Sequence, residues 1–220
     1  MWKRTLNGQV LRFHLSGINN QNFIMQDEET GSYWQQVTGK AISGPLKGSA
    51  LELASTNELS FGLWKNEAPN GTVLQMSGPD SKHYESDWEE KLKKYPSILR
   101  FSDSNLDSRE VVLGISLNGA DRAFVLQKVL LERIVHDEVG GTNLILVAGP
   151  DNKSVRAFRS GTLEFFAKEG EPGKMMDSAN MRVWDFRGCS GDACLEPVPL
   201  LKDFWFDWRQ YHPRTTVYQK

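Results

Sequence analysis

The sequence predicts a mainly β fold with an α+β fringe: one β-rich domain over residues 1–220, with short strands and two or three short peripheral helices. Three observations support this prediction. Short apolar stretches recur along the chain, and several alternate apolar with polar residues. Turn-forming residues, among them 19 glycines, separate these stretches. Helical periodicity is confined to brief segments, and no internal repeat or low-complexity linker is evident.

The first half is read as short strands joined by turns. Asn7-Gly8 is a hairpin turn signal. We expect strands at residues 10–15, 23–25 and 32–37, because apolar residues alternate with polar ones or cluster there. A weaker pattern predicts a helix at 60–67.

The second half carries two clearer helical patterns. Residues 83–95 place an apolar stripe at helical spacing, which predicts a helix there. Residues 203–211 form a short aromatic helix, with Asp203 expected as its N-cap. Apolar patterning predicts the remaining strands at residues 111–117, 123–126, 143–148, 155–159, 163–167 and 181–185.

Composition narrows the class of protein. Hydrophobic residues make up 39% and charged residues 25%, which is ordinary for a globular protein. The 26 basic and 28 acidic residues lack the basic surplus of a nucleic-acid binder, so no nucleic-acid partner is expected. The longest aliphatic run, 144–148, is far shorter than the ~20 residues of a membrane span, and we expect no transmembrane segment in this chain. No signal peptide is visible either, so the chain as it stands is typical of a cytoplasmic protein.

Two cysteines, Cys189 and Cys194, lie in a glycine-rich stretch. No histidine is nearby to complete a zinc site, so zinc or redox chemistry is disfavoured. Two readings remain open: a pair of free thiols, or one local disulfide.

No familiar catalytic motif is present, so chemistry must be sought in single residues. Of the four histidines, His136 is the most informative, because it lies where an apolar strand meets a glycine turn beside Asp137. Neighbouring strand residues point to opposite faces, so Asp137 is poorly placed to orient His136. We favour a structural hydrogen bond from His136 to a backbone carbonyl, and keep metal or acid–base work as the alternative.

Polar residues gather around the first strands, among them Asn22, Asp27, Gln36 and Thr38. Buried polar side chains are costly unless hydrogen-bonded, so this set either stabilises turns or lines a site. The seven tryptophans fit core packing better than a ligand cleft, because their spacing in two segments is that of a helix face.

A long run from Trp34 to Gly48, Trp-x-Gln-x-x-Gly-x-Ala-Ile-x-Gly-x-Leu-x-Gly, is specific enough to indicate a family. Together with His136-Asp137 and the closing Phe204-Trp-Phe-Asp-Trp and Tyr211-His-Pro-Arg-Thr runs, it resembles the bacterial and archaeal family called domain of unknown function 3179. The resemblance covers almost the whole chain and implies no activity.

The resemblance implies two further features. Family members typically open with Cys-x-x-Cys shortly before the strand matching residues 10–15, and many begin with an export or lipoprotein signal. This chain starts just after the expected Cys pair. The resemblance therefore implies a periplasmic or otherwise extracytoplasmic protein, and soft-metal or thiol chemistry if the pair belongs to it.

Three hypotheses follow. The first is an extracytoplasmic module that binds a small ligand or a metal such as copper or zinc, with Asn22, Trp34, Gln36 and His212 as ligand-binding residues and His136 and His212 as candidate metal ligands. The second is an enzyme that uses His136 or Asp27 as a general base in a cleft covered by Trp34. The third is an interaction or scaffold domain in which the same residues serve turns and packing.

Overall fold

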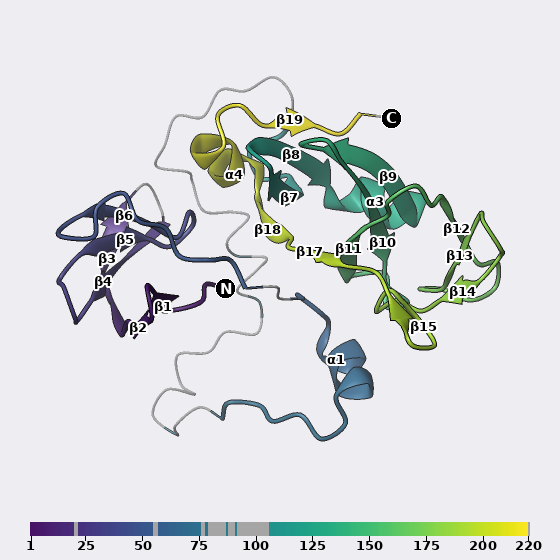
Figure 1. Ribbon diagram of the computed structural model, residues 1–220, viewed down its shortest axis with the longest axis horizontal. Helices are drawn as coiled ribbons and strands as arrows, with labels where there is room; N and C mark the ends of the chain where they lie inside the picture. The colour runs from purple at the N-terminus through teal and green to yellow at the C-terminus, as the bar shows by residue number, and fades with distance from the viewer. Residues whose placement is uncertain are drawn as a thin grey trace.

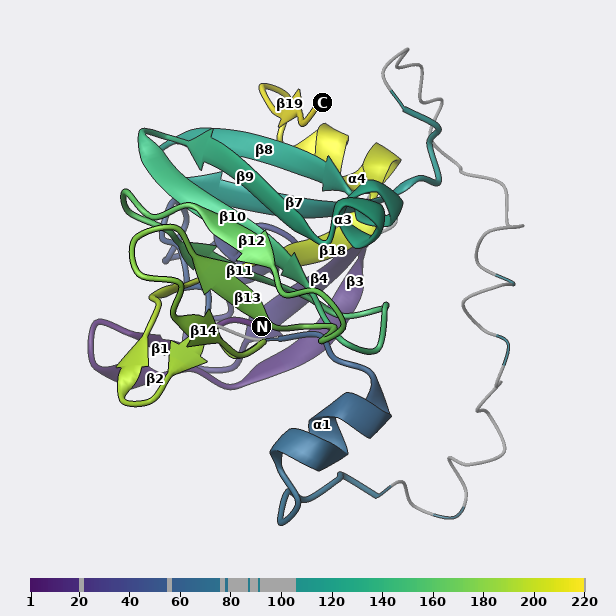
Figure 2. The same ribbon diagram turned by 90° about the vertical axis from the view of Figure 1, so that its right-hand side faces the viewer.

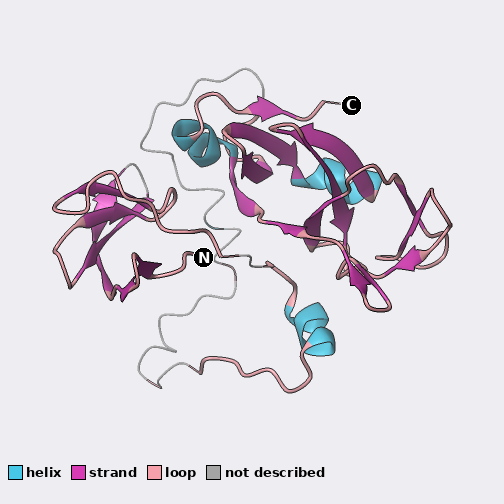
Figure 3. Ribbon diagram, in the orientation of Figure 1, coloured by secondary structure: helices cyan, strands magenta, loops and turns pink. Residues whose placement is uncertain are grey.

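The computed structural model describes residues 1–19, 22–54, 57–75, 78, 87, 91 and 106–219 (Figure 1). Within these ranges strands predominate and the helices are short, which confirms the predicted fold class (Figure 3). The helices are α1 (Phe61–Glu67), α3 (Leu126–Glu132) and α4 (Trp205–Tyr211). Of the helix predicted at 83–95, only Asp87 and Lys91 lie among the described residues; the Lys91 N–H donates to the Asp87 carbonyl oxygen over 3.0 Å, the spacing of an α-helical bond.

Two four-stranded sheets form the centre of the protein. One has the order β18-β7-β8-β19 and the other β17-β11-β10-β9; neighbours are antiparallel except β8 and β19. The bounds of the first sheet are β18 (Leu201–Phe204), β7 (Val111–Leu117), β8 (Ala120–Val125) and β19 (Thr216–Val217). Those of the second are β17 (Pro197–Val198), β11 (Val155–Arg159), β10 (Thr142–Ala148) and β9 (Ile134–Val139).

Both central sheets are buried on two faces. Along β10, Leu144 and Leu146 join the core between the sheets, whereas Ile145 and Val147 join a second apolar cluster on the outer face. Alternate residues of a strand point to opposite faces, so burial on both faces requires an uninterrupted apolar run. The run at 144–148 therefore reflects a central strand.

The N-terminal residues form a sheet of their own, at the left of Figure 1. Its strands are β3 (Phe13–Asn19), β4 (Asn22–Asp27), β5 (Tyr33–Gln35) and β6 (Lys40–Ser43), in chain order. A hairpin of β1 (Thr5–Leu6) and β2 (Gln9–Val10) precedes it. Asn7 and Gly8 both have positive φ at the hairpin turn, which confirms the turn expected there.

A three-stranded sheet covers the outer face of the β10 sheet. It contains β12 (Phe165–Ala167), β13 (Met175–Asp177) and β14 (Val183–Trp184). The next hairpin pairs β15 (Cys189–Ser190) with β16 (Ala193–Cys194), and a disulfide joins its two cysteines. The sequence left open a pair of free thiols or one local disulfide, and the structure has the local disulfide.

The strands β3-β4-β5 (the first meander) and β12-β13-β14 (the second meander) are built alike. In the first, Asp27 pairs with Phe13, and Trp34 pairs with Met25. In the second, the corresponding residues have the same registers: Phe165 with Asp177 and Met175 with Trp184.

The contacts within the two meanders match as well. The indole Nε1 of Trp34 donates to Asp27 over 2.7 Å, and that of Trp184 donates to Asp177 over 2.8 Å. In each meander the Phe and Trp rings meet edge to face. The backbone N–H four residues after each Asp bonds back to that Asp's carbonyl oxygen, and this turn residue has positive φ in both. The chain thus contains a structural repeat, although none was expected from the sequence. In both copies a Met-x-Asp run is followed, after six further residues, by Trp: Met25 to Trp34 and Met175 to Trp184.

The repeat extends to the helical segments 57–74 (the α1 segment) and 201–218 (the α4 segment). Both contain Trp-x-x-x-x-Pro, at Trp64 and Trp208. Both helices have seven residues and end alike, because the backbone of Ala68 (φ −127°, ψ 68°) and that of His212 (φ −122°, ψ 66°) bond back to the respective tryptophan carbonyl. In this register Leu59 corresponds to Asp203 and Leu63 to Asp207.

Two expectations about local structure were wrong. Asp203 is not an N-cap: it ends strand β18 beside Val112 of β7, and Phe204 is the residue before α4. The helix α3 was missed: a strand was expected at 123–126, and no element was expected over the residues that follow. Leu126, Val129 and Leu130 nevertheless have helical spacing, and all three are buried in the central core.

Candidate functional site

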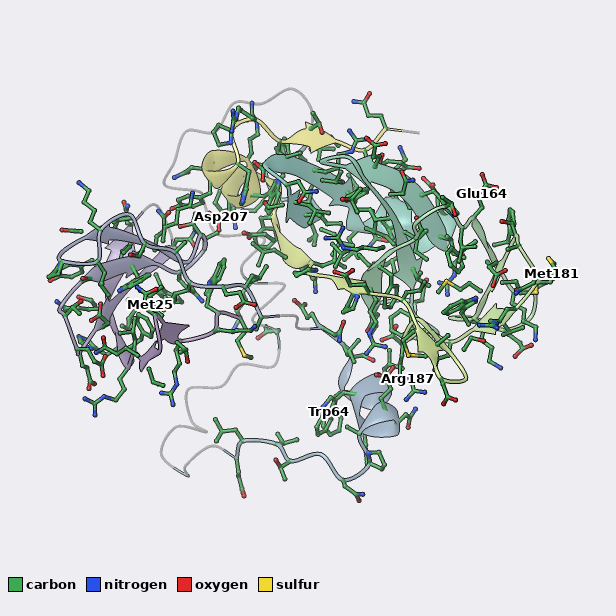
Figure 4. The ribbon with its side chains drawn as sticks, viewed as in Figure 1. Met25, Trp64, Glu164, Met181, Arg187 and Asp207 are labelled. Atoms are coloured by element: carbon green, nitrogen blue, oxygen red, sulfur yellow. A yellow bond between two sulfur atoms is a disulfide. The ribbon has the colours of Figure 1, made fainter. Side chains whose placement is uncertain are left out.

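The N-terminal sheet meets α4 through polar side chains, in what we call the α4 junction. The amide Nδ2 of Asn22 donates to Asp207 Oδ1 over 2.5 Å. The hydroxyl of Tyr211 donates to the Asn19 carbonyl oxygen over 3.4 Å. Figure 4 labels Asp207 where α4 faces the N-terminal sheet. Residues almost a chain length apart are therefore held together here.

Strand alternation explains which face of the N-terminal sheet takes part. Met25 packs into the sheet's own apolar cluster, so Asn22 and Ile24 face the opposite side. Gln35 is the cross-strand partner of Ile24 and shares that face. Asn22 and Gln35 both hydrogen-bond the Tyr211 side chain.

Two carboxyl groups lie side by side at the junction. Asp203 and Asp207 are hydrogen-bonded through their side chains, and Asp203 Oδ1 also accepts from the Phe204 N–H over 2.7 Å. Burial, with the adjacent Asp207 charge, raises the pKa of Asp203 to about 8. Burial also raises the pKa of Asp207, although hydrogen bonds from Asn22 and Asp203 oppose this. At neutral pH Asp203 therefore holds its proton and donates it in the hydrogen bond to Asp207.

A cavity of about 380 Å³ opens beside this junction. Trp2, Thr38 and Lys40 line it from the N-terminal side, and Tyr211, His212 and Arg214 are among the residues on the other side. This size is within the range of small-ligand sites.

His212 forms part of the cavity wall and is fixed in place. Its ring stacks on Trp208, with centroids 3.6 Å apart, and Nδ1 lies 3.0 Å from the Trp208 carbonyl oxygen. Burial lowers the pKa of His212, and the nearby Lys40 acts in the same direction. A Cβ on Gly114 would collide with the Trp208 ring, so the strand beneath needs glycine.

Of the residues expected to bind ligand, the structure brings Asn22 and His212 to this region. Trp34 is fully buried (0% exposed) in the apolar cluster of the N-terminal sheet, so its ring covers no cleft. Gln36 is exposed, and its carbonyl accepts from Trp2 Nε1 over 2.6 Å. Its neighbour Gln35 faces α4 instead.

The two candidate general bases lie in different places. Asp27 accepts hydrogen bonds from Trp34 and Thr30 in a buried turn; burial opposes its charge, but these bonds keep the pKa of Asp27 below its usual value. His136 lies on β9, where Nε2 accepts from the Phe165 N–H over 3.0 Å. We expected this ring to donate to a backbone carbonyl, whereas its Nε2 accepts from a backbone N–H. Asp137 pairs with Arg122 over 2.7 Å.

The described residues do not fit a copper or zinc site. No group of three His, Cys, Asp or Glu side chains among them is arranged to hold a metal. His136 and His212 belong to separate cavities, and the two cysteines are joined to each other.

The sequence reasoning missed Asp203 and Asp207 as a pair, along with Tyr211 and Lys40. One signal could have found the carboxyls. Aligning the two Trp-x-x-x-x-Pro segments sets Asp203 and Asp207 against two leucines, a change of polarity at positions that otherwise share one local structure.

Fold and site together define a β-rich protein with a repeated three-stranded meander and a cavity at the α4 junction. Residues 1–215 match the family described as "Protein of unknown function (DUF3179)", and the chain belongs to this family, as the sequence indicated. No curated protein matches the chain, and neither does any solved structure. Among the described helices, none is long and apolar enough to cross a membrane.

Proposed function

We propose that this protein is a binding module for a small organic anion, and that its site is the cavity at the α4 junction. One observation carries the proposal: the cavity brings Lys40 of the N-terminal sheet and Arg214 of the α4 segment to one space. Neither side chain has an ion-pair partner among the described residues.

The other lining groups support an anionic ligand with a flat or apolar part. Asp121 brings a negative charge to the wall, but its carboxylate accepts a hydrogen bond from Ser116 Oγ over 2.5 Å. Lys40 and Arg214 outnumber it. Trp2 and the His212 ring add flat surfaces against which a small ligand can pack.

We also propose an extracytoplasmic location, in agreement with the family resemblance. The disulfide between Cys189 and Cys194 supports it, because disulfides persist mainly in oxidising compartments.

The test is a titration of the protein with succinate, citrate and inorganic phosphate, followed by tryptophan fluorescence and calorimetry. We expect saturable binding of at least one organic anion, weakened about tenfold by Lys40→Gln or Arg214→Gln, which each remove one charge contact. Lys47→Gln and Arg4→Gln are matched controls, because both side chains are exposed and neither lines the cavity. Equal affinity in all four variants, or no saturable binding, would contradict the proposal.

The alternatives gain less from the structure. An enzyme that uses His136 and Asp27 in one cleft needs these side chains to converge, and the structure does not bring them together. A scaffold protein needs Trp34 and Trp208 for packing, and both are buried. A binding module needs the same packing, so their burial does not separate these two hypotheses.

A further inference from the structure

The α4 junction depends on a hydrogen-bonded chain that crosses from one part of the protein to the other. Asp203 of β18 is bonded to Asp207 of α4, and Asp207 accepts from Asn22 of β4. Neither carboxyl is among the residues that line the cavity.

The protonation state of the pair affects the hydrogen bond between Asp207 and Asn22. With one proton, Asp203 donates to Asp207, and the single charge of Asp207 is bound by the Asn22 amide. Without it, two carboxylates face each other at hydrogen-bond distance in a half-buried corner, where their repulsion is strong.

The charged and titratable groups around the pair do not relieve this repulsion. On α4, His212 lies near enough to favour the Asp207 charge, but burial lowers the pKa of His212 and keeps its ring neutral at neutral pH. Tyr211 is a phenol whose pKa burial raises. Lys40 of the N-terminal sheet and Asp121 of β8 act on His212. No described lysine or arginine forms an ion pair with Asp203 or Asp207.

The repeat shows that this corner does not need carboxyl groups for packing. In the α1 segment the corresponding residues are Leu59 and Leu63, which pack against the apolar cluster of the second meander. An apolar pair is thus compatible with the same backbone. Partly buried carboxyls without a cation cost stability, so their presence at only one of the two corners indicates a role other than packing.

We propose that Asp203 and Asp207 are positioning residues: while they share one proton they hold Asn22, and with it the N-terminal wall of the cavity, against α4. Loss of the proton releases Asn22 and loosens that wall. Ligand affinity is then linked to pH, a consequence that rests on the proposed binding function. The release of Asn22 does not rest on it.

The test follows the Asn22 side-chain amide by NMR from about pH 6 to about pH 9.5, a range that spans the pKa of Asp203. We expect its signals to titrate with a midpoint near the pKa of about 8 in the unaltered protein. In Asp203→Asn the Asn22 signals should stay constant with pH. The new amide at position 203 still donates a hydrogen bond to Asp207, but it has no proton to lose in this pH range. Asp192→Asn, in the exposed turn of the β15–β16 hairpin, is the control and should titrate like the unaltered protein.

The variant Asp203→Leu/Asp207→Leu copies the α1 segment and addresses folding. It should remain folded and show no titration of Asn22. An Asn22 signal that does not change with pH in the unaltered protein, or that titrates equally in Asp203→Asn, would overturn the proposal.

Ligand binding is measured separately, with the organic anion that binds best. We expect affinity to fall about tenfold from about pH 7 to about pH 9, and less than about twofold in Asp203→Asn. If Asn22 titrates but no anion binds, the binding function fails and the positioning role stands. If an anion binds with the same affinity across this range while Asn22 titrates, the proposed link between the pair and the cavity is overturned.

Discussion

The two corners where a helical segment meets a meander share one backbone design and differ in chemistry. At the α4 junction, Asn22 of the first meander donates a hydrogen bond to Asp207 of the helix. At the other corner, which we call the α1 junction, Leu59 and Leu63 pack on the apolar cluster that contains Trp184. Figure 2 shows α1 well apart from α4.

Charge at the α1 junction is paired directly. Glu67 forms a two-pronged ion pair with Arg156, at 2.9 and 2.7 Å, and Arg156 lies over the Phe186 ring. Arg187, labelled near α1 in Figure 4, also feels the Glu67 charge. The α1 junction is thus built for stability, whereas the α4 junction keeps unpaired cations and a proton-sharing acid pair. The difference separates what the fold requires from what a function requires.

The largest expected difference concerns the two tryptophans of the repeated helices. Trp208 of α4 is 1% exposed, whereas no residue of α1 is buried, Trp64 included. We expect Trp208→Ala to lower the free energy of unfolding by about 3–5 kcal/mol and Trp64→Ala by about 1–2 kcal/mol. Urea denaturation of both variants measures this. Equal losses would show that α1 is packed as tightly as α4.

The second comparison concerns the two buried Asp–Trp hydrogen bonds. Asp27→Asn should lower the free energy of unfolding by about 1.5–3 kcal/mol, because bonds to a charged acceptor are lost. Asp177→Asn should act in the same direction but less, since its bonds to backbone N–H groups, 3.0 and 3.1 Å, are longer than the 2.6 Å bond from Thr30 to Asp27. Urea denaturation at neutral pH measures the loss of stability in each variant. A larger loss in Asp177→Asn than in Asp27→Asn would contradict the prediction.

The same aspartates have a pH signature of opposite sign to that of Asp203. The pKa values of Asp27 and Asp177 lie below that of an unfolded aspartate, so their stabilisation is present at neutral pH and is lost as the pH falls through the lowered values. The pKa of Asp203 is raised, so its contribution is complete below the unfolded pKa and is lost as the pH rises towards about 8. The measurement is the melting temperature as a function of pH. In Asp27→Asn the fall of the melting temperature at acid pH should become shallower, and in Asp203→Asn the fall towards about pH 8 should become shallower; each variant should leave the other part of the curve unchanged.

A third comparison uses the disulfide. Cys189 pairs directly with Cys194, and the matching bridge after the first meander is Lys40 with Ala50, which has no cross-link. Removing the short disulfide loop by Cys189→Ala/Cys194→Ala should cost about 2 kcal/mol. Reducing agent should lower the free energy of unfolding of the unaltered protein to that of the variant. It should not change the stability of the variant. A further shift in the variant would exclude the disulfide as the cause.

The smallest expected effect is at Glu67. Glu67→Gln keeps the size of the side chain and weakens the ion pair with Arg156, for an expected loss of about 1–2 kcal/mol. The stability profile above neutral pH should keep its slope, because the acid pair of the other corner is untouched. If stability no longer fell with rising pH in Glu67→Gln, the group that titrates above neutral pH would lie at the α1 junction.

Much of the local structure could be read from the sequence. The strands at 111–117 and 155–159 and the turn at Asn7-Gly8 agree with the structure, because alternation and turn residues act over short distances. The helix expected at 60–67 begins one residue later, at Phe61, with Ser60 as its N-cap, and ends at Glu67 as predicted. The candidate site was predicted less well. Asp203 was read as a cap because a helix pattern follows it, and a strand partner on β7 is invisible to local rules.

The sequence by itself determined the fold class, the family and the positions of most strands, since these depend on apolar periodicity and short motifs. Only the tertiary structure decided that Asn22 meets Asp207, that Lys40 and Arg214 share a cavity, and that Asp27 is committed to Trp34. The reason is physical. Each of the first two meetings joins the N-terminal sheet to the last helical segment, and local preferences carry no information about which distant surfaces pack together.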